Sequence, residues 1–314
     1  MNKAQRLLDE ALAPRSSGPA AALHGWRNRR ALRQLVAESD PLVQYTLDGT
    51  RLWMPLSHQL PLIRRDHPGY SRNAGRIAKC VIEAHPGTAM IDIGANIGDT
   101  VAIVRSQVHC PVLCIEGNPK FLEVLEMNLA ALGTDVHVEP CYVGAEDGAI
   151  SGTVETQKGS ATIAASDTQT IRMRTLRAIL DNHPRLGRAS LLKIDTDGFD
   201  GHIIRGAADV LARHRPALFF EYDPYFLVRA NDEGLSLFPF LEGLGYDSAL
   251  VYDNFGRFML LGHCRDAETW RDLHAYHTGR GSSLYMDICV MHRDDVAVAQ
   301  KLRTLEHSPA SLAA

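Results

Sequence analysis

Residues 91–100 constrain the fold more than any other segment, and they read Ile-Asp-Ile-Gly-Ala-Asn-Ile-Gly-Asp-Thr. They complete an apolar run with the length of a buried strand and lead into a segment of helical character. Gly94 and Gly98 permit a tight turn and let a ligand approach the backbone closely. The helix start then offers backbone N–H groups and a positive dipole end to an anionic group. The segment therefore predicts a strand, a ligand-binding turn and a helix in direct succession.

Strands and helices alternate from residue 88 onward. The expected strands cover residues 88–93, 111–115, 135–139, 190–194 and 217–220. The expected helices between them cover residues 98–108, 119–132, 175–182 and 201–213. This alternation predicts the α/β fold class, with a doubly wound, mostly parallel, seven-stranded sheet of the Rossmann-like type and helices on both faces.

The end of this region departs from the alternation. Residues 247–252 and 257–261 flank the turn signal Asp253-Asn-Phe-Gly256, which indicates an antiparallel hairpin. A last strand is expected near residues 284–292. An antiparallel strand late in a parallel sheet favours a methyltransferase over a dehydrogenase. The sequence leaves open which of the late strands enters the sheet.

Three regions follow from this reading. Residues 1–87 form an N-terminal extension with helices, a hairpin around Asp48-Gly49 and a loop rich in His, Pro and Arg. Residues 88–292 form the ligand-binding domain, and residues 293–314 form a C-terminal helix and tail. The extension is larger than ligand binding by the sheet requires, so we expect it to contribute to substrate binding or to dimerisation.

Composition excludes several classes of protein. The net charge is −4, which argues against a protein dominated by nucleic-acid contacts. No apolar run reaches the roughly 20 residues that a membrane span needs, and the N-terminus lacks a signal-peptide apolar region. The six cysteines form no Cys-x-x-Cys pair and several lie in apolar runs. We therefore expect a cytoplasmic protein with reduced cysteines and no membrane or nucleic-acid partner.

The glycine-rich turn distinguishes between two nucleotide cofactors. The NAD fingerprint would require glycine at positions 96 and 99, which hold Asn96 and Asp99. Asp92 would repel a pyrophosphate, but it suits the ammonium of a bound amino acid. S-adenosylmethionine carries both an ammonium and a carboxylate, so it fits this turn better. The predicted cofactor contacts here are Asp92, Gly94, Ala95, Asn96, Gly98, Asp99 and Thr100.

Glu116 follows the second strand, 22 residues after Gly94. A carboxylate at this position accepts hydrogen bonds from ribose hydroxyls. Gly117 and Asn118 are expected beside the adenine. Residues 141–145, with Val143 and Gly144, follow the third strand and are expected to cover the other face of the adenine.

A third motif, Leu-Lys-Ile-Asp-Thr-Asp-Gly-Phe-Asp-Gly, covers residues 192–201. Lys193 lies inside a strand, which is costly for a charged side chain unless it is paired or reaches solvent. Asp195 and Asp197 lie at the carboxyl end of the strand, where open α/β sheets bind ligands. Asp200 is placed to cap the following helix.

Together these motifs resemble the FkbM family of S-adenosylmethionine-dependent methyltransferases. The resemblance rests on residues 92–100, 114–119 and 192–200, followed by Ile-Ile-Arg-Gly-Ala at 203–207, and it covers about residues 85–255. The upstream segments 57–61 and 67–71 also resemble segments that precede the core in this family. Many members carry Glu where this chain has Asp197. The resemblance implies O-methylation, commonly of sugars or natural-product scaffolds.

The predicted site follows from the strand tips and this resemblance. Asp195, Asp197 and Lys193 are the predicted catalytic residues, with a strand-tip carboxylate as general base or acceptor-orienting group. The predicted acceptor-binding residues are His58, Tyr70, Glu221 and Asp223. The predicted reaction is in-line transfer of the methyl group to a hydroxyl of a small molecule or glycan.

Several alternatives stay open. A divalent metal near the strand-tip carboxylates is not favoured, because no dense carboxylate run is present, and we assign no metal ligand. Methylation of RNA or protein, and a nucleotide-binding module without catalysis, are the alternative functions. The sequence does not decide the acceptor or the oligomeric state, for which a homodimer is the working assumption.

Overall fold

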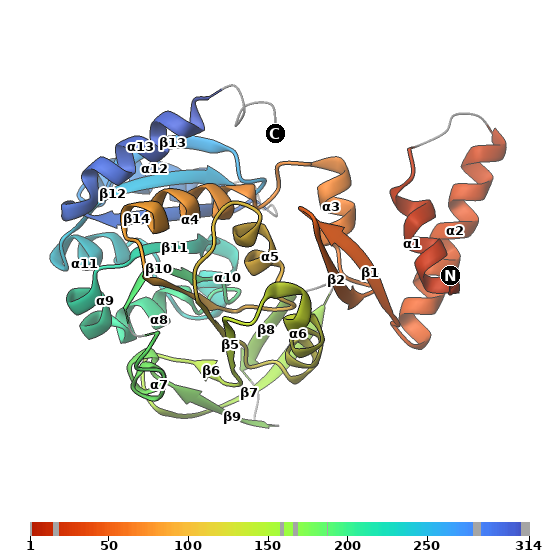
Figure 1. Cartoon of the computed structure of the whole chain (residues 1–314), viewed down its shortest axis with the longest axis horizontal. Coiled ribbons are helices and arrows are strands. Elements are labelled where there is room, and N and C mark those ends of the chain that lie inside the picture. The colour runs from red at the N-terminus through yellow and green to blue at the C-terminus, as the bar shows by residue number, and fades with distance from the viewer. Residues whose placement is uncertain are drawn as a thin grey trace.

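A central sheet with helices on both faces organises the chain (Figure 1). The computed structural model describes residues 2–14, 19–157, 160–165, 169–186, 188–278 and 284–308. Within these residues the central sheet has eight strands. In order across the sheet they are β13 (Phe258–His263), β12 (Tyr246–Asp253), β14 (Met286–His292), β11 (Ala217–Tyr222), β10 (Ala189–Ile194), β3 (Ala89–Ile93), β4 (Val112–Ile115) and β5 (Val136–Glu139).

The strand directions confirm the predicted fold class. Strands β5, β4, β3, β10 and β11 pair in parallel. Strand β14 runs antiparallel between β11 and β12, and β13 pairs antiparallel with the outer edge of β12. The sheet thus has one strand more than the seven predicted, because both strands of the late hairpin and the last strand enter it.

Two hydrophobic cores lie on the two faces of this sheet, because successive side chains of a strand point to opposite faces. Met90 belongs to one core and Ile91 to the other. The first core is covered by α4 (Arg72–Ala84), α5 (Asp99–Arg105), α6 (Pro119–Leu132) and α13 (Val296–Glu306). The second is covered by α7 (Leu176–Asn182), α8 (Asp200–Gly206), α9 (Ala208–His214), α10 (Pro224–Arg229), α11 (Leu237–Gly243) and α12 (Ala267–Thr278).

The predicted hairpin in the N-terminal extension is confirmed. Strands β1 (Leu42–Leu47) and β2 (Thr50–Pro55) pair antiparallel around Asp48 and Gly49, which both have positive φ. The Asp48 carboxylate holds Arg64 of α3 (Leu60–Asp66) at 2.6 Å, and Arg64 also donates to the carbonyl of Tyr70. The hairpin thus fixes the segment that leads into α4.

Helices α1 (Lys3–Leu12) and α2 (Pro19–Glu38) pack against each other at one end of the molecule, beyond the hairpin (Figure 1). Helix α4 falls within the 1–87 extension of the predicted division, yet it packs on the sheet and against α5 and α13. The predicted C-terminal helix is present as α13, after the short 3₁₀ helix η1 (Arg293–Asp295), and the tail beyond residue 308 lies outside the described residues.

A second sheet follows the third parallel strand of the domain. Its strands, in order across the sheet, are β6 (Tyr142–Val143), β9 (Gln169–Arg174), β7 (Gly148–Gln157) and β8 (Ser160–Ala165). Because β6 pairs in parallel with β9, this sheet brings Tyr142 beside Met173. Both side chains become part of the site described below.

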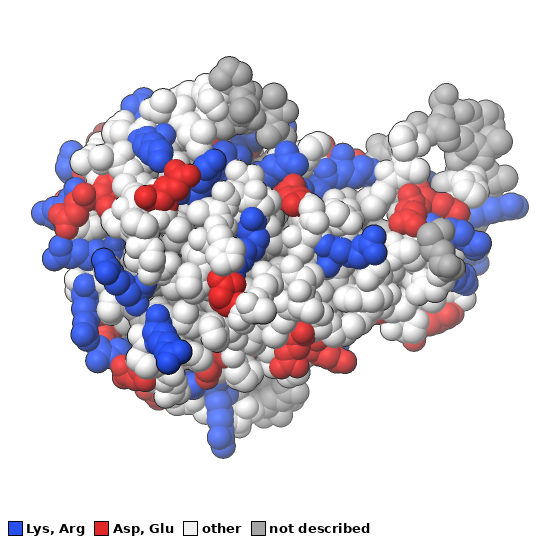
Figure 2. Space-filling view, viewed as in Figure 1, with Lys and Arg blue, Asp and Glu red and all other residues white. Residues whose placement is uncertain are grey.

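The state of the cysteines and the distribution of surface charge agree with the expectations from the composition. All six cysteines are free, and all except Cys141 are buried. Figure 2 shows positive and negative side chains interspersed over the face in view. None of the described helices combines the length and apolar character that a bilayer crossing requires.

Candidate active site

The turn after β3 brings the chain very close to β10. Gly94, Asn96 and Gly98 all have positive φ, at 76°, 50° and 86°. A Cβ on Gly94 would collide with the carbonyl oxygen of Asp195. This position therefore requires glycine both for its backbone angle and for the close approach.

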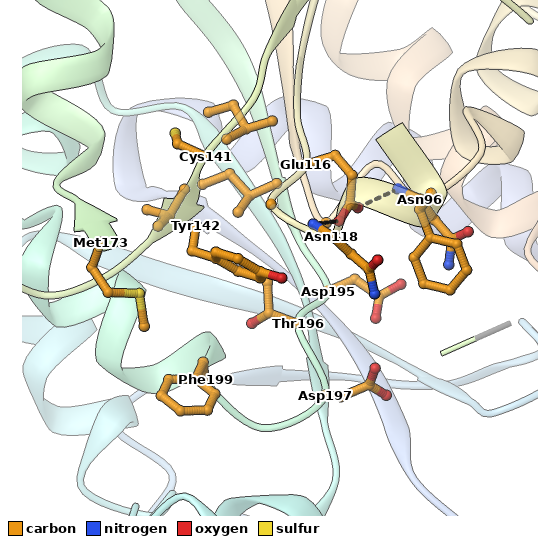
Figure 3. Close-up of a pocket in the computed structure, with 16 residues that line it drawn as sticks. Asn96, Glu116, Asn118, Cys141, Tyr142, Met173, Asp195, Thr196, Asp197 and Phe199 are labelled. Atoms are coloured by element: carbon orange, nitrogen blue, oxygen red, sulfur yellow. Dashed lines mark hydrogen bonds between the residues drawn. The ribbon is translucent and has the colours of Figure 1, made fainter. Parts of the chain in front are cut away.

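Glu116, directly after β4, holds this turn in place. Its Oε2 accepts the Asn96 N–H at 2.8 Å and its Oε1 accepts the Asn118 N–H at 2.7 Å (Figure 3). The carboxyl group is 7% exposed. Burial raises the pKa of Glu116 to about 7, although the two backbone N–H groups oppose the shift. The turn and the strand tip thus meet at one carboxylate.

A cavity opens beside this carboxylate, which we call the Glu116 cavity. Its polar side carries Glu116, Asn118 and Asp195, whereas Tyr142, Met173 and Phe199 lie on the opposite side (Figure 3). The Tyr142 ring lies directly against Gly117, where a Cβ would collide with it. The cavity thus combines hydrogen-bonding groups on one wall with a flat aromatic ring and a thioether on the other. The remaining lining residues are Ile93, Gly94, Asn96, Ile115, Gly117, Phe121, Cys141, Val143, Thr196 and Asp197.

Lys193 is buried in the sheet beneath the turn and is 4% exposed. Its ammonium lies 3.0 Å from Asp92 Oδ1 and 3.3 Å from Asp195 Oδ2, and it donates to the Gly94 carbonyl at 3.2 Å. Burial alone would lower the pKa of Lys193, but the carboxylates of Asp92 and Asp195 outweigh burial and raise it. Lys193 therefore remains an ammonium that anchors the turn and the Asp195 strand tip.

Asp200 is not the helix cap that the sequence predicts. It is the first residue of α8, and its Oδ2 accepts hydrogen bonds from the backbone and hydroxyl of Thr196 at 3.3 and 3.0 Å. The loop before it is tightly bent, with positive φ at Asp197 and Gly198. Asp200 thus shapes the 195–199 loop from inside, and burial raises its pKa to about 7.

A second cavity of about 240 Å³ adjoins the first, and we call it the Glu221 cavity. The two cavities share Gly94, Asn96, Asp195 and Asp197. The N-terminal extension and the start of α4 supply one wall, with His58, Gln59, Leu60, Ile63, Tyr70, Ser71, Asn73 and Ala74. The sheet and later loops supply the rest, with Asp99, Thr100, Lys193, Phe219, Glu221, Phe226, Tyr285 and Asp287.

Three carboxylates form a row across adjacent strands in the Glu221 cavity. Ile194 pairs with Phe220, so the next residues, Asp195 and Glu221, are neighbours, and Glu221 pairs with Asp287. Burial and the nearby carboxylates raise the pKa of Glu221 well above its usual range. Burial also raises the pKa of Asp287 to about 7, against a 3.1 Å hydrogen bond from Asn73. Both groups therefore hold protons more readily than exposed carboxyl groups do.

His58 is 9% exposed and joins the N-terminal extension to the turn. Its Nδ1 accepts the Leu60 N–H at 3.3 Å. Burial lowers the pKa of His58 to about 4, opposed in part by a side-chain hydrogen bond with Asn96. A neutral ring whose Nδ1 is an acceptor carries its proton on Nε2.

Most of the predicted site residues line one of the two cavities, and five of them line neither. The predicted residues that line the Glu116 cavity include Gly94, Asn96, Glu116, Gly117, Asn118, Val143 and Asp195. The predicted residues that line the Glu221 cavity include His58, Tyr70, Asp99, Thr100, Lys193, Asp197 and Glu221. Like Gly94, Asn96 and Asp195, Asp197 lines both cavities. The predicted residues that line neither are Asp92, Ala95, Gly98, Gly144 and Asp223. Asp92 is completely buried and faces Lys193, and Asp223 accepts the Tyr225 N–H at 2.8 Å as the cap of α10.

Several lining residues are not among those predicted individually as site residues. Tyr142, Met173 and Phe199 complete the Glu116 cavity, and Asn73, Tyr285 and Asp287 complete the Glu221 cavity. Phe199 stands inside the third motif, and Asp287 lies within the last predicted strand at residues 284–292, where no sequence signal marked it as a site residue. Tyr142 and Met173 become neighbours only through the pairing of β6 with β9.

Among the residues that the structure describes, no group of three or more His, Cys, Asp or Glu side chains is arranged to hold a metal ion.

Comparison with known proteins identifies the family. The model of the methyltransferase FkbM domain matches residues 92–248, which is half of the 314-residue chain. No curated protein matches the chain.

The similar solved structures are distant. Methyltransferase FkbM from Methylobacillus flagellatus KT is 20% identical, with a TM-score of 0.34, over 48% of this chain and only 37% of that one. Precorrin-6y C5,15-methyltransferase from Geobacter metallireducens GS-15 is 14% identical, with a TM-score of 0.38, over 70% of this chain and 86% of that one. An O-methyltransferase from Bacillus cereus in complex with SAH is 11% identical, with a TM-score of 0.37, over 69% and 80%. On the family match, which spans all three sequence motifs, this chain belongs to the FkbM family of S-adenosylmethionine-dependent methyltransferases.

Proposed function

We propose that this enzyme is an O-methyltransferase that methylates a hydroxyl of a sugar, glycan or natural-product acceptor. The observation that carries the proposal is the contact between the two cavities at Gly94, Asn96, Asp195 and Asp197. One cavity has the groups that a nucleoside requires, and the other is a separate polar space. A methyl donor and an acceptor bound in them would meet at Asp195.

The Glu116 cavity fits S-adenosylmethionine on the residues present. Glu116 is a buried carboxylate at the strand tip, in position to accept the ribose hydroxyls. Gly117 lacks the Cβ that would collide with the Tyr142 ring, so this ring lies against the backbone and lines the cavity as an aromatic neighbour for a flat adenine. When bound, S-adenosylmethionine supplies an electrophilic methyl group on its sulfonium.

Asp195 is our candidate for the general base. Its carboxylate lines both cavities, and Lys193 holds it at 3.3 Å. A hydroxyl that attacks the methyl carbon must lose its proton, and Asp195 is placed to accept it. Asp197 lines both cavities as well and serves as an acceptor-orienting group in this proposal.

The neighbouring groups have supporting roles. Lys193 stays protonated because its pKa is raised, so it acts as a positioning residue rather than a base. His58 presents its Nε2 proton as a donor toward Asn96 and the acceptor side. Tyr70 and Tyr285 face each other with their hydroxyls 3.4 Å apart and add polar contacts for a hydroxylated ring.

The test combines binding and turnover. We expect calorimetry to show binding of both S-adenosylmethionine and S-adenosylhomocysteine. Asp195→Asn should lower the rate of methyl transfer to a hydroxylated acceptor by about 10²–10⁴-fold, since it removes a general base. Its affinity for S-adenosylhomocysteine should stay close to that of the unaltered enzyme. Asp181→Asn, at an exposed position on α7, is the control and should leave both quantities unchanged.

Two results would contradict the proposal. Absence of binding by either cofactor form would remove its basis. Product analysis that places the new methyl group on nitrogen or carbon would overturn the assignment of a hydroxyl acceptor.

A further inference from the structure

The sheet wall of the Glu221 cavity carries more acidic side chains than its described basic side chains can pair with. Asp195, Glu221 and Asp287 stand in one row across three adjacent strands. Lys193 is the only lysine or arginine among the described lining residues, and it is already shared by Asp92 and Asp195. His58 adds no charge, since burial lowers its pKa to about 4. The wall therefore disfavours an acceptor group that is itself anionic.

The row is suited to an organic cation rather than a metal ion. Neighbouring strands lie about 4.8 Å apart, so Asp195 and Asp287 are separated by about two such steps. No described group of three acidic or histidine side chains converges on one point. A group with several N–H donors can bridge such spaced carboxylates, whereas a small metal ion needs them to converge.

Glu221 has unused hydrogen-bonding capacity in this wall. Its Oε1 is shielded from solvent and has no hydrogen-bond partner among the described residues. A buried acceptor without a partner costs stability, so such an atom points to a donor that a ligand brings. Asp287 accepts a single described hydrogen bond, from Asn73 at 3.1 Å. Burial raises the pKa of both carboxyl groups, so they hold protons more readily when no cation is present.

We propose that the acceptor is an amino alcohol of the aminosugar or aminocyclitol class, whose ammonium group binds between Glu221 and Asp287 while its hydroxyl meets Asp195. This inference rests on the proposed function and specifies its substrate class. Asp195 and Glu221 are adjacent in the row. The methylated hydroxyl and the amine therefore lie on neighbouring ring carbons or one carbon apart.

Binding of matched sugars tests the inference directly. Calorimetry would use the enzyme saturated with S-adenosylhomocysteine, with methyl 2-amino-2-deoxy-α-D-glucopyranoside as the probe. Methyl α-D-glucopyranoside, which has a hydroxyl in place of the amine, is the matched neutral ligand. We expect the amine to bind at least about tenfold more tightly. Binding of the amine should also release protons from the carboxyl pair, and titrations in two buffers of different ionisation enthalpy measure this release.

Variants identify the binding groups. Glu221→Gln and Asp287→Asn keep the side-chain shapes and remove the charges, so each should weaken amine binding by about tenfold or more. Affinity for the neutral glucoside should change by much less. Asp181→Asn should change neither affinity, and unaltered binding of S-adenosylhomocysteine shows that each variant is folded.

The outcomes separate the two proposals. If S-adenosylhomocysteine binds but the amine binds no better than the glucoside, or not at all, the aminosugar inference is overturned and the proposed function stands. If S-adenosylhomocysteine itself does not bind, the proposed function fails and the inference fails with it.

Discussion

Lys193 Nζ lies 3.0 Å from Asp92 Oδ1, and the two residues pair directly across the parallel strands β10 and β3. Both side chains are buried, with exposures of 4% and 0%. The same ammonium reaches the Gly94 carbonyl and Asp195. One ion pair inside the sheet thus supports both the turn beside the Glu116 cavity and the strand tip between the two cavities.

Removal of one partner should therefore destabilise the fold strongly. Lys193→Met leaves Asp92 buried without its cation, and we expect a loss of about 3–5 kcal/mol in the free energy of unfolding. The double variant Lys193→Met/Asp92→Asn removes both charges and should recover much of this loss. Urea denaturation measures all three proteins. A single variant within about 1 kcal/mol of the unaltered enzyme would show that the pair does not support the sheet.

Gly94→Ala should abolish cofactor binding through a backbone collision. The new Cβ meets the carbonyl of Asp195, which directly follows β10 and whose N–H donates to the Ile93 carbonyl at 3.1 Å, so it cannot move away without disturbing that contact. Gly87 is a matched control, because its φ of 78° is close to the 76° of Gly94 and nothing lies within 4 Å of its Cβ position. Both variants carry the cost of a positive φ, about 1–2 kcal/mol. Calorimetry with S-adenosylhomocysteine should show loss of binding in Gly94→Ala alone, and similar behaviour of both variants would rule out the collision.

Glu116→Gln should weaken binding of S-adenosylmethionine and S-adenosylhomocysteine by about 10- to 100-fold. Both carboxylate oxygens already accept backbone N–H groups, at 2.8 and 2.7 Å, and glutamine offers only one such oxygen. The substitution also removes an acceptor for the ribose. Glu123→Gln, on the exposed face of α6, is the control and should bind normally. Equal affinities of the two variants would place the ribose elsewhere.

Asp287 should make the ligand-free enzyme less stable as pH rises. Its pKa increases from 3.8 to about 7 on folding, so between these values the folded protein holds a proton that the unfolded chain has lost. Folding stability therefore decreases with pH across this window. Asp287→Asn removes the titration, and the slope of unfolding free energy against pH should become less negative by about 1.4 kcal/mol per pH unit. Parallel slopes for both proteins would show that this carboxyl group titrates normally.

Much of the lining of the Glu116 cavity could be predicted because its signals are local. The strand, the glycine turn and the helix are contiguous in residues 91–100, and Glu116 follows the next strand along the chain. Strands β3 and β4 are adjacent in the sheet as well as in sequence, so chain order alone brings Gly94 and Glu116 together. The predicted hairpin at Asp48 and Gly49 was equally local.

The Glu221 cavity depends on strand pairings that no local sequence signal encodes. Asp287 reaches Glu221 only because β14 inserts between β11 and β12. Asp223 also follows a strand, which suggested an acceptor contact; in the structure Pro224 starts α10 and Asp223 caps that helix, and its contact with an acceptor stays a prediction. Asp92 likewise stands at the right point of the motif, but its cation is Lys193, and only the register of β3 and β10 reveals this partner.

The insertion of β14 between β11 and β12 also means that the central sheet can be completed only late in synthesis. When the ribosome has reached residue 280, the nascent chain already contains Gly94, Glu116 and Asp195, but β11 and β12 have no strand between them. Their edges are apolar and unpaired until residues 286–292 emerge, which makes this the stage most exposed to aggregation. Asp287 is thus synthesised well after Gly94, Glu116 and Asp195, and late truncations should yield insoluble chains rather than slow enzymes.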